Sequence, residues 1–331
     1  MKSALGNASG AVVRTAPDVL FEAPQRAPSV SLPPLRQVSS APGAPHNRPR
    51  SGWRATLEER FQLGNVLIVG SVLTLAFVVA CAAFPGLIAP YLPTDMHADA
   101  ILASPSGAHW FGTDQFGRDV FSLVVYGARQ SVLTGVFAVL ISCTLGVSIG
   151  LVAGYAGGWL DTALMRLIDI WMSIPNILLA IALSTVLGPS LHNTILAISL
   201  VTIPRYARVL RGQALAVRSR PFIEASRAAG ASHWSILRRH ILPHCSAQIL
   251  VLATLGVGGA ILIGSGLSFL GLGVNDERPD WGFLLTQGRS YLTVAWWTVT
   301  YPGLAITALV VSVNLLGDAL RRRLDPRSAP R

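Results

Sequence analysis

Long apolar runs, separated by shorter charged segments, dominate the chain between residues 65 and 319. Each run is close to the ~20 residues that an α-helix needs to cross the hydrocarbon core of a bilayer. The pattern therefore predicts an all-α polytopic membrane protein with six transmembrane helices. The predicted spans cover residues 65–90, 131–155, 167–187, 193–211, 246–270 and 297–319.

The segments outside these spans divide the chain further. Residues 1–50 contain eight prolines and no apolar period, which predicts a disordered cytoplasmic tail. Residues 51–130 are expected to hold an interfacial helix, the first transmembrane helix and an extracytoplasmic loop. The transmembrane core follows at 131–320, and a basic cytoplasmic tail at 321–331. Within 53–61, Trp53, Leu57 and Phe61 lie on one helical face, which suits an interfacial helix.

The composition excludes two broad classes of protein. The chain is 51% hydrophobic and only 13% charged, whereas a soluble domain carries about a quarter charged residues. A net charge of +10 could indicate a nucleic-acid partner, but the charges lie beside runs long enough to cross a bilayer. The expected surrounding is therefore a lipid bilayer and not nucleic acid. Three cysteines lie in or beside apolar runs without ligand spacing, as buried thiols do: Cys81, Cys143 and Cys245.

The distribution of arginine predicts the orientation. Cytoplasmic loops of membrane proteins carry an excess of lysine and arginine. With both termini cytoplasmic, 22 of the 26 basic residues lie inside. The two long outer loops, 92–130 and 271–296, hold four arginines and seven acidic residues. Both termini and the segment 212–245 are therefore expected in the cytoplasm.

The segment 212–245 is charged and patterned, although it lies between apolar runs. It contains FIEASRAAGASHWSILRRHILP, from Phe222 to Pro243. Pro221 suits the first turn of a helix, Gly230 suits a left-handed residue that ends it, and Ser232 suits the cap of a second helix. Three apolar side chains are then expected on one face of the second helix: Trp234, Leu237 and Ile241. The prediction is a rigid helix–turn–helix elbow that projects into the cytoplasm.

The sequence disfavours three other kinds of chemistry, namely ion-gradient transport, a zinc site and a calcium site. An ion-gradient transporter needs ionisable groups near mid-membrane, and the nearest, Asp169, is expected to pair locally with Arg166. His240 and His244 have the spacing of zinc ligands, but Pro243 between them disturbs the helix, so no metal site is predicted. Thr113 is expected to cap a helix whose first turn contains Asp114. Asp114 and Asp119 together are too few ligands for a calcium ion.

Four ordered motifs resemble a known family. Glu224-Ala225-Ser226, then Gly230, then Ile241-Leu242-Pro243 look like the EAA loop of permease subunits in binding-protein-dependent ABC importers, with serine where the family usually has alanine. The stretches HWFGTDQFGRDVFSLVVYGAR (109–129), GLSFLGLGV (266–274) and NLLGDALRRRLDPR (314–327) are similar to the dipeptide/oligopeptide/nickel branch. The resemblance covers residues 52–327 and is closest to the C-type subunit.

The resemblance implies a type I importer permease fold with a cytoplasmic coupling helix that docks into an ABC ATPase. Its ATPase-coupling residues would be Glu224, Ala225, Ser226, Gly230, Ile241, Leu242 and Pro243. A Walker A loop needs a lysine, and the only lysine is Lys2. The chain is therefore expected not to be an enzyme and to hold no cofactor, with ATP and magnesium in partner subunits.

The resemblance also implies the other partners and the location, which is the bacterial cytoplasmic membrane. A second permease subunit would complete the path, and an extracytoplasmic solute-binding protein would deliver the solute. The outer loop NDERPDWG is either a solvated turn or part of the surface that meets this protein, through Asp276, Glu277, Asp280 and Trp281. The cargo is expected to be a di- or oligopeptide, with nickel or another small solute as the alternative.

Overall fold

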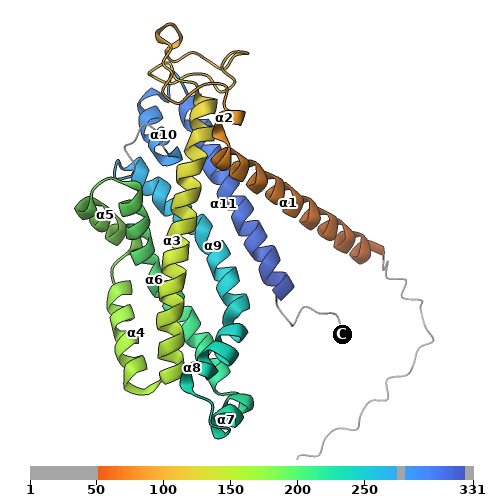
Figure 1. The fold of residues 1–331 in the computed structure, drawn as a ribbon. Helices are drawn as coiled ribbons and strands as arrows, with labels where there is room; N and C mark the ends of the chain where they lie inside the picture. The colour runs from red at the N-terminus through yellow and green to blue at the C-terminus, as the bar shows by residue number, and fades with distance from the viewer. Residues whose placement is uncertain (1–50, 274–279, 325–331) are drawn as a thin grey trace, which may run out of the picture. The chain divides into compact units, whose positions relative to one another are not determined.

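A computed structural model describes residues 51–273 and 280–324, and for residues 51–64 it describes the backbone alone. Every regular element in these ranges is helical (Figure 1). The predictions for the two tails and for Asp276 and Glu277 concern residues outside these ranges. The longer elements are α1 (Ser51–Ala83), α3 (Val120–Ala156), α4 (Gly158–Met172), α5 (Asn176–Leu187), α6 (Leu191–Arg218), α9 (Leu242–Phe269) and α11 (Trp297–Leu324). The shorter ones are α2 (Pro85–Ile88), η1 (Ala98–Ala100), α7 (Pro221–Ala228), α8 (His233–Ile236), η2 (Leu237–Ile241), α10 (Trp281–Gly288) and η3 (Arg289–Tyr291).

Fewer helices than the six predicted have the length and composition of a membrane span. In the part of the chain that the structure describes, four do, at Asn65–Ala83, Val120–Ala156, His233–Phe269 and Trp297–Leu324. The pair α4 and α5 makes a fifth if it is counted as one bent span. The polytopic all-α class is confirmed, whereas the count of six is not.

The predicted third span, residues 167–187, is wrong as a continuous helix. It is broken between α4 and α5, whose axes differ by 83°. Pro175 has no N–H for a helical hydrogen bond, and it disfavours helical backbone at the residue before it, Ile174. Ser173 ends α4 by donating both its backbone N–H (3.2 Å) and its hydroxyl (2.6 Å) to the carbonyl of Ile170.

The packing of α3 against α6 forms the centre of the bundle. Glycines at 146, 150 and 154 of α3 face the backbone of α6, and a Cβ added at Gly150 would lie 2.4 Å from the carbonyl oxygen of Ala207. Small residues allow helices to approach this closely within a membrane. The fourth predicted span lies in α6, whose three arginines at 205, 208 and 211 explain why it does not qualify as a span by composition.

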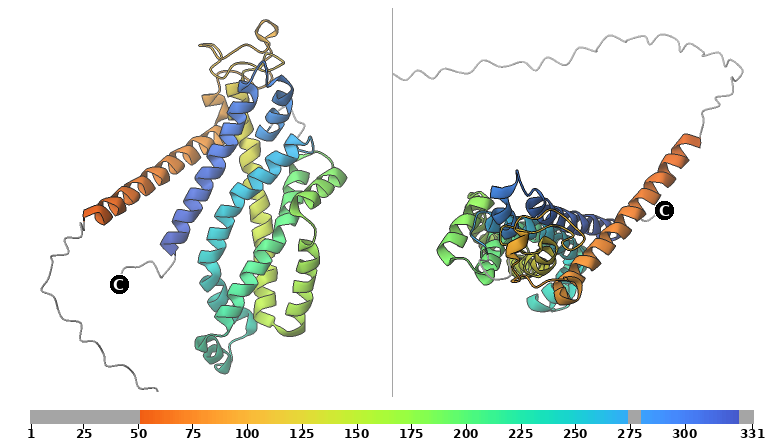
Figure 2. Two further views of the ribbon diagram at one scale, coloured as in Figure 1. Left: turned by 180° about the vertical axis from the view of Figure 1, so that it is seen from behind. Right: turned by 90° about the horizontal axis from the view of Figure 1, so that it is seen from above.

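The helix α1 packs on α3 and α11 through a second core cluster that includes Val78 and Cys81 (Figure 2). The first span was predicted to continue to residue 90, but α1 ends at Ala83 and Pro85 begins the short helix α2. The separate interfacial helix predicted within 53–61 is instead the continuous start of α1. Most side chains of α1 from Val66 onward are exposed within this chain, and they are apolar.

Candidate functional site

The predicted elbow is present at one end of the bundle, and the long loop before α3 lies at the other end (Figures 1 and 2). Pro221 occupies the first turn of α7, as predicted. Gly230 has φ +80°, a left-handed conformation that glycine adopts without a steric penalty. Its N–H donates to the carbonyl of Arg227 at 2.9 Å and closes the end of α7. Ser232 caps α8 by accepting from the N–H of Ser235 at 3.3 Å.

The inner side of the elbow is anchored in the main hydrophobic core. Ile223, Ile236 and Ile241 are fully buried. The prediction that Trp234, Leu237 and Ile241 share one face is wrong, because Trp234 is 68% exposed. The physical reason is the π-helical turn η2, which has more residues per turn than an α-helix and rotates the following side chains.

The outer side of the elbow offers small residues and one carboxylate. Glu224, Ala225 and Gly230 are exposed. Ser226 donates its hydroxyl to the carbonyl of Phe222 at 2.8 Å, so a serine in place of alanine leaves no unsatisfied polar group on this surface. Such a surface permits close approach of a partner and provides one hydrogen-bond acceptor in Glu224. Leu242 and Pro243 are also exposed where α9 begins.

A second contact fixes the elbow to the end of α3. The Tyr155 hydroxyl lies 2.7 Å from Nδ1 of His233, and the Arg227 guanidinium lies 5.3 Å from the centre of the Tyr155 ring. A cation over an aromatic face is attracted by the ring quadrupole. Sequence patterns do not predict the role of Tyr155, because it lies 78 residues before His233 and no local pattern relates the two residues.

The histidines near the elbow contact polar groups of the protein itself. His233 contacts Tyr155, and Nδ1 of His244 lies 2.6 Å from the carbonyl oxygen of His240. Within residues 51–273 and 280–324, no group of three or more metal-ligating side chains comes together.

Two ion pairs join α4 to α6. Asp161 accepts two hydrogen bonds from Arg211, at 2.5 and 2.7 Å, in a bidentate arrangement. Asp169 pairs with Arg208, 39 residues away, at 2.5 Å. The predicted local pair of Asp169 with Arg166 is therefore wrong. Asp161 and Asp169 of α4 therefore each pair with an arginine of α6, and not with an arginine of their own helix.

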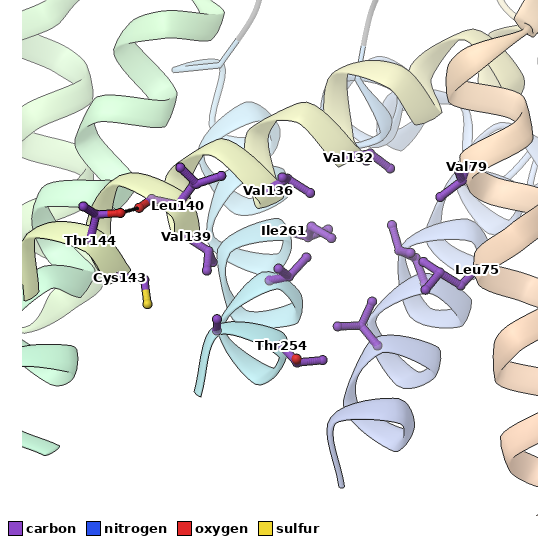
Figure 3. Close-up of a pocket in the computed structure, with 14 residues that line it drawn as sticks. Leu75, Val79, Val132, Val136, Val139, Leu140, Cys143, Thr144, Thr254 and Ile261 are labelled. Atoms are coloured by element: carbon purple, nitrogen blue, oxygen red, sulfur yellow. Dashed lines mark hydrogen bonds between the residues drawn. The ribbon is translucent and has the colours of Figure 1, made fainter. Parts of the chain in front are cut away.

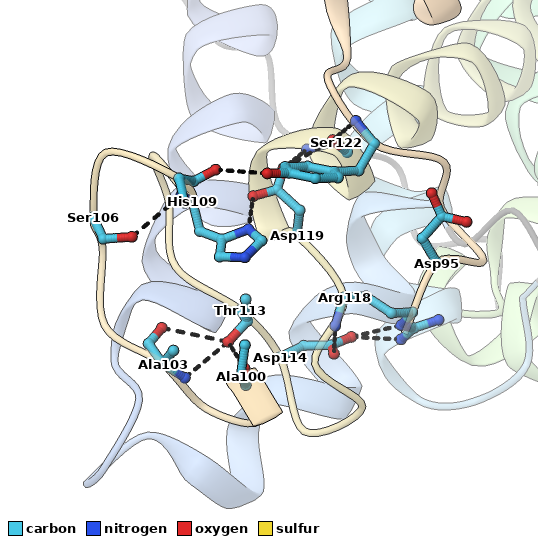
Figure 4. A network of polar contacts seen from close by, with 12 residues as sticks. Asp95, Ala100, Ala103, Ser106, His109, Thr113, Asp114, Arg118, Asp119 and Ser122 are labelled. Atoms are coloured by element: carbon cyan, nitrogen blue, oxygen red, sulfur yellow. Dashed lines mark hydrogen bonds and ion pairs between the residues drawn. The ribbon is translucent and has the colours of Figure 1, made fainter. Parts of the chain in front are cut away.

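The loop before α3 is folded by polar contacts (Figure 4). Asp119, and not Thr113, caps α3: its carboxylate accepts from the N–H of Ser122 at 2.8 Å and lies 3.1 Å from Nδ1 of His109. The prediction of a cap at Thr113 is wrong, because its hydroxyl is buried and instead accepts from the N–H of Ala103 at 2.8 Å. The motif is local, but which of its residues caps the helix depends on where the loop enters it.

Arg118 extends this network to a distant part of the chain. It is largely buried, and its guanidinium pairs with Asp114 at 2.7 Å and donates to Gln287 of α10 at 3.0 Å. A buried arginine is stabilised by such paired hydrogen bonds. The loop and α10 are thus held together at this end of the bundle.

The two described residues of the predicted outer contact surface lie inside the fold. Asp280 accepts from the N–H of Phe283 at 2.8 Å, which caps α10, and from the hydroxyl of Ser268 at 2.5 Å. Burial raises the pKa of the Asp280 carboxyl. Trp281 is 1% exposed and donates its indole N–H to the carbonyl of Val124. This burial is at odds with a direct contact between either side chain and a partner.

An apolar groove opens between α1, α3, α9 and α11 (Figure 3). Its volume is about 530 Å³, and its lining includes Leu75 and Val79 from α1, Val136 from α3 and Ile261 from α9. Among the described residues, no charged side chain lines it. The groove is therefore suited to an apolar neighbour within the membrane.

The chain resembles known proteins over most of its length. A family model described as "Binding-protein-dependent transport system inner membrane component" matches residues 146–330. A dipeptide transport system permease of Alkalihalophilus pseudofirmus is 41% identical over 281 residues, which are 84% of this chain and 90% of that protein. A glutathione transport system permease of Pectobacterium atrosepticum is 38% identical over 84% of this chain and 92% of that protein.

A further relative and a solved structure agree with these matches. A probable D,D-dipeptide transport system permease of Escherichia coli K12 is 41% identical over 80% of this chain and 89% of that protein. A chain of the MetNI methionine ABC transporter, in an inward-facing conformation, matches with a TM-score of 0.50 at 20% identity, covering 61% of this chain and 96% of that one. The similarity to this solved structure confirms the predicted fold.

Proposed function

Because this chain belongs to the family of binding-protein-dependent transport system inner membrane components, we propose that it is the permease subunit of an ATP-driven importer of di- or oligopeptides. The relatives include permeases named for dipeptide and glutathione transport, and a peptide is the cargo common to those names. The chain forms part of the membrane path and does not itself hydrolyse ATP.

The observation that carries this proposal is the elbow. Its inner side is fixed by three buried isoleucines and by the Tyr155–His233 contact, while Glu224, Ala225 and the left-handed Gly230 face outward. A rigidly held, outward-facing surface of small residues is suited to receive mechanical force from a docked ATPase. Rocking of helical bundles, a rigid-body change, would then open the path to one side at a time.

Two further partners follow from the same proposal. A second permease subunit completes the path, and the apolar groove between α1 and α9, which no described residue fills, is suited to an apolar neighbour in the membrane. A solute-binding protein meets the opposite end of the bundle, where buried polar contacts hold the loop before α3 to α10 in one shape. The ATPase subunits, of one or two kinds, meet the elbow.

Dependence on these partners can be measured directly. The purified chain alone is expected to show no ATP hydrolysis, because it has no lysine besides Lys2 for a phosphate-binding loop. The complex purified with its neighbouring subunits and reconstituted in vesicles is expected to import radiolabelled alanyl-alanine only with ATP and the binding protein. Uptake driven by a proton gradient without ATP would contradict the proposal and favour a secondary transporter.

The topology gives a second prediction. We propose that the elbow and both termini are cytoplasmic, as the arginine excess at that end supports. Single cysteines are placed at Ser104 in the outer loop and at Arg238 beside the elbow, both exposed, after replacement of the three native cysteines. An impermeant thiol reagent on intact cells is expected to label position 104 and not 238, and the reverse pattern would contradict the orientation.

A further inference from the structure

The break between α4 and α5 exposes non-helical backbone at membrane depth. Ser173, Ile174 and Pro175 are all exposed in this chain. Taken together, α4 and α5 have the length and composition of one bent membrane span. The break between them therefore lies inside a stretch that qualifies as membrane-spanning. Irregular backbone is tolerated at that depth only where protein covers it or where it lines a water-filled cavity.

An exposed ion pair lies beside this break. Asp169 is one turn before the end of α4, and its carboxylate lies 2.5 Å from the Arg208 guanidinium of α6. The two side chains are 55% and 48% exposed. Arg205, one turn before Arg208 on α6, is also exposed and has no ion pair among the described residues. Charged side chains at this depth face a bundle interior or water, because contact with lipid tails costs several kcal/mol.

The opposite side of the bundle has the chemistry of a lipid-facing surface. The exposed side chains of α1 are apolar, such as Leu73 at 65% and Val69. Figures 1 and 2 place α1 and the pair α4–α5 on different sides of α3. On the α4–α6 side, by contrast, exposed charged side chains and exposed non-helical backbone lie close together.

We propose that the α4–α5 break and the Asp169–Arg208 pair line the aqueous translocation path and form a transient subsite for the charged ends of a peptide. A guanidinium binds a carboxylate through two parallel hydrogen bonds. The free α-carboxylate of the peptide would bind Arg208 and the unpaired Arg205, while its ammonium group would bind Asp169. This inference rests on the proposed function, because it assigns a wall and a ligand to the same path.

The ion pair explains why such a subsite would release its bound peptide quickly. While the path is empty, Asp169 and Arg208 satisfy each other. A zwitterionic peptide exchanges one set of ion pairs for another, so the free-energy change is small and release is fast. The second link between the helices, Asp161 with Arg211, holds α4 to α6 while the outer pair opens.

The accessibility of the break to water tests whether the break lines the translocation path. In a variant without native cysteines, Ser173→Cys is compared with Leu73→Cys, two exposed positions on opposite sides of the bundle. In the complete complex, a charged methanethiosulfonate reagent is expected to modify position 173 at least tenfold faster than position 73. Saturating alanyl-alanine with the binding protein and ATP is expected to slow the reaction at 173. Equal, negligible labelling at both positions would overturn the proposal, because the break would then be covered.

Neutralising both charges tests the subsite. The double variant Asp169→Asn with Arg208→Gln removes both members of the pair, so neither charge is left without its partner, and it keeps the Asp161–Arg211 link. Assembly and ATP hydrolysis are expected to stay at the wild-type level, while uptake of alanyl-alanine falls at least tenfold. Wild-type uptake would show that the pair only fastens two helices, and loss of assembly would assign it to packing against the second permease. Either result overturns the subsite.

The wild-type complex separates this inference from the proposed function. If it imports alanyl-alanine while position 173 stays unlabelled, the subsite fails and the importer stands. If the wild-type complex does not move the peptide under any condition, the proposed function fails.

Discussion

Replacing Gly150 by valine is expected to keep α3 and α6 apart and to remove most folded protein from the membrane. A Cβ at this position would lie 2.4 Å from the carbonyl oxygen of Ala207 and 3.0 Å from the N–H nitrogen of Arg211. Both atoms belong to the backbone of α6, so no flexible side chain can move away. Overpacking a core costs about 1–3 kcal/mol, and a backbone clash at the central helix contact should lie at or above that range. The yield of monodisperse protein and its thermal midpoint measure the effect.

A matched substitution separates overpacking from the intrinsic effect of valine in a helix. Gly259 lies in the helix α9, and a Cβ added there meets nothing within 4 Å. Gly259→Val is therefore expected to fold with nearly the wild-type yield and midpoint. If Gly150→Val matched that control, the close contact of α3 with α6 would be disproved.

A valine at position 230 is expected to leave folding intact and to abolish coupling to the ATPase. Gly230 has φ +80°, and a Cβ there meets nothing within 4 Å. The cost is therefore backbone strain of about 1–3 kcal/mol for a β-branched residue, confined to an exposed turn between buried anchors. The strain and the added bulk change the surface that we propose docks into the ATPase. Membrane abundance should be normal, while ATPase co-purification and peptide uptake are lost.

The control for this variant is a nearby glycine without the special conformation. Gly212 lies in the helix α6, is exposed and has free space around it, and its φ is not left-handed. Gly212→Val should retain ATPase association and uptake. Normal uptake by Gly230→Val would remove the elbow from the coupling mechanism, and low abundance of that variant would show that the turn is needed for folding instead.

The sequence was most informative where a few neighbouring residues decide the structure. Pro221, Gly230 and Ser232 were each placed correctly in the elbow, because a helix start, a left-handed turn and a cap depend on the backbone within about four residues. The lengths of the apolar runs likewise predicted most of the membrane-spanning helices. Hydropathy, however, concealed the break in the predicted third span, because the run stays apolar across Pro175 while proline interrupts the helix.

The sequence by itself determined the helical membrane class, the family, and the helix start, left-handed turn and cap of the elbow. Only the tertiary structure decided which distant groups meet: Asp169 with Arg208, Tyr155 with His233, and Trp281 with the carbonyl of Val124. These pairings are 39, 78 and 157 residues apart, and they follow from how α4 packs on α6 and how α8 and α10 pack on α3. A buried or membrane-embedded polar group takes the partner that packing brings within reach, which sequence spacing does not encode.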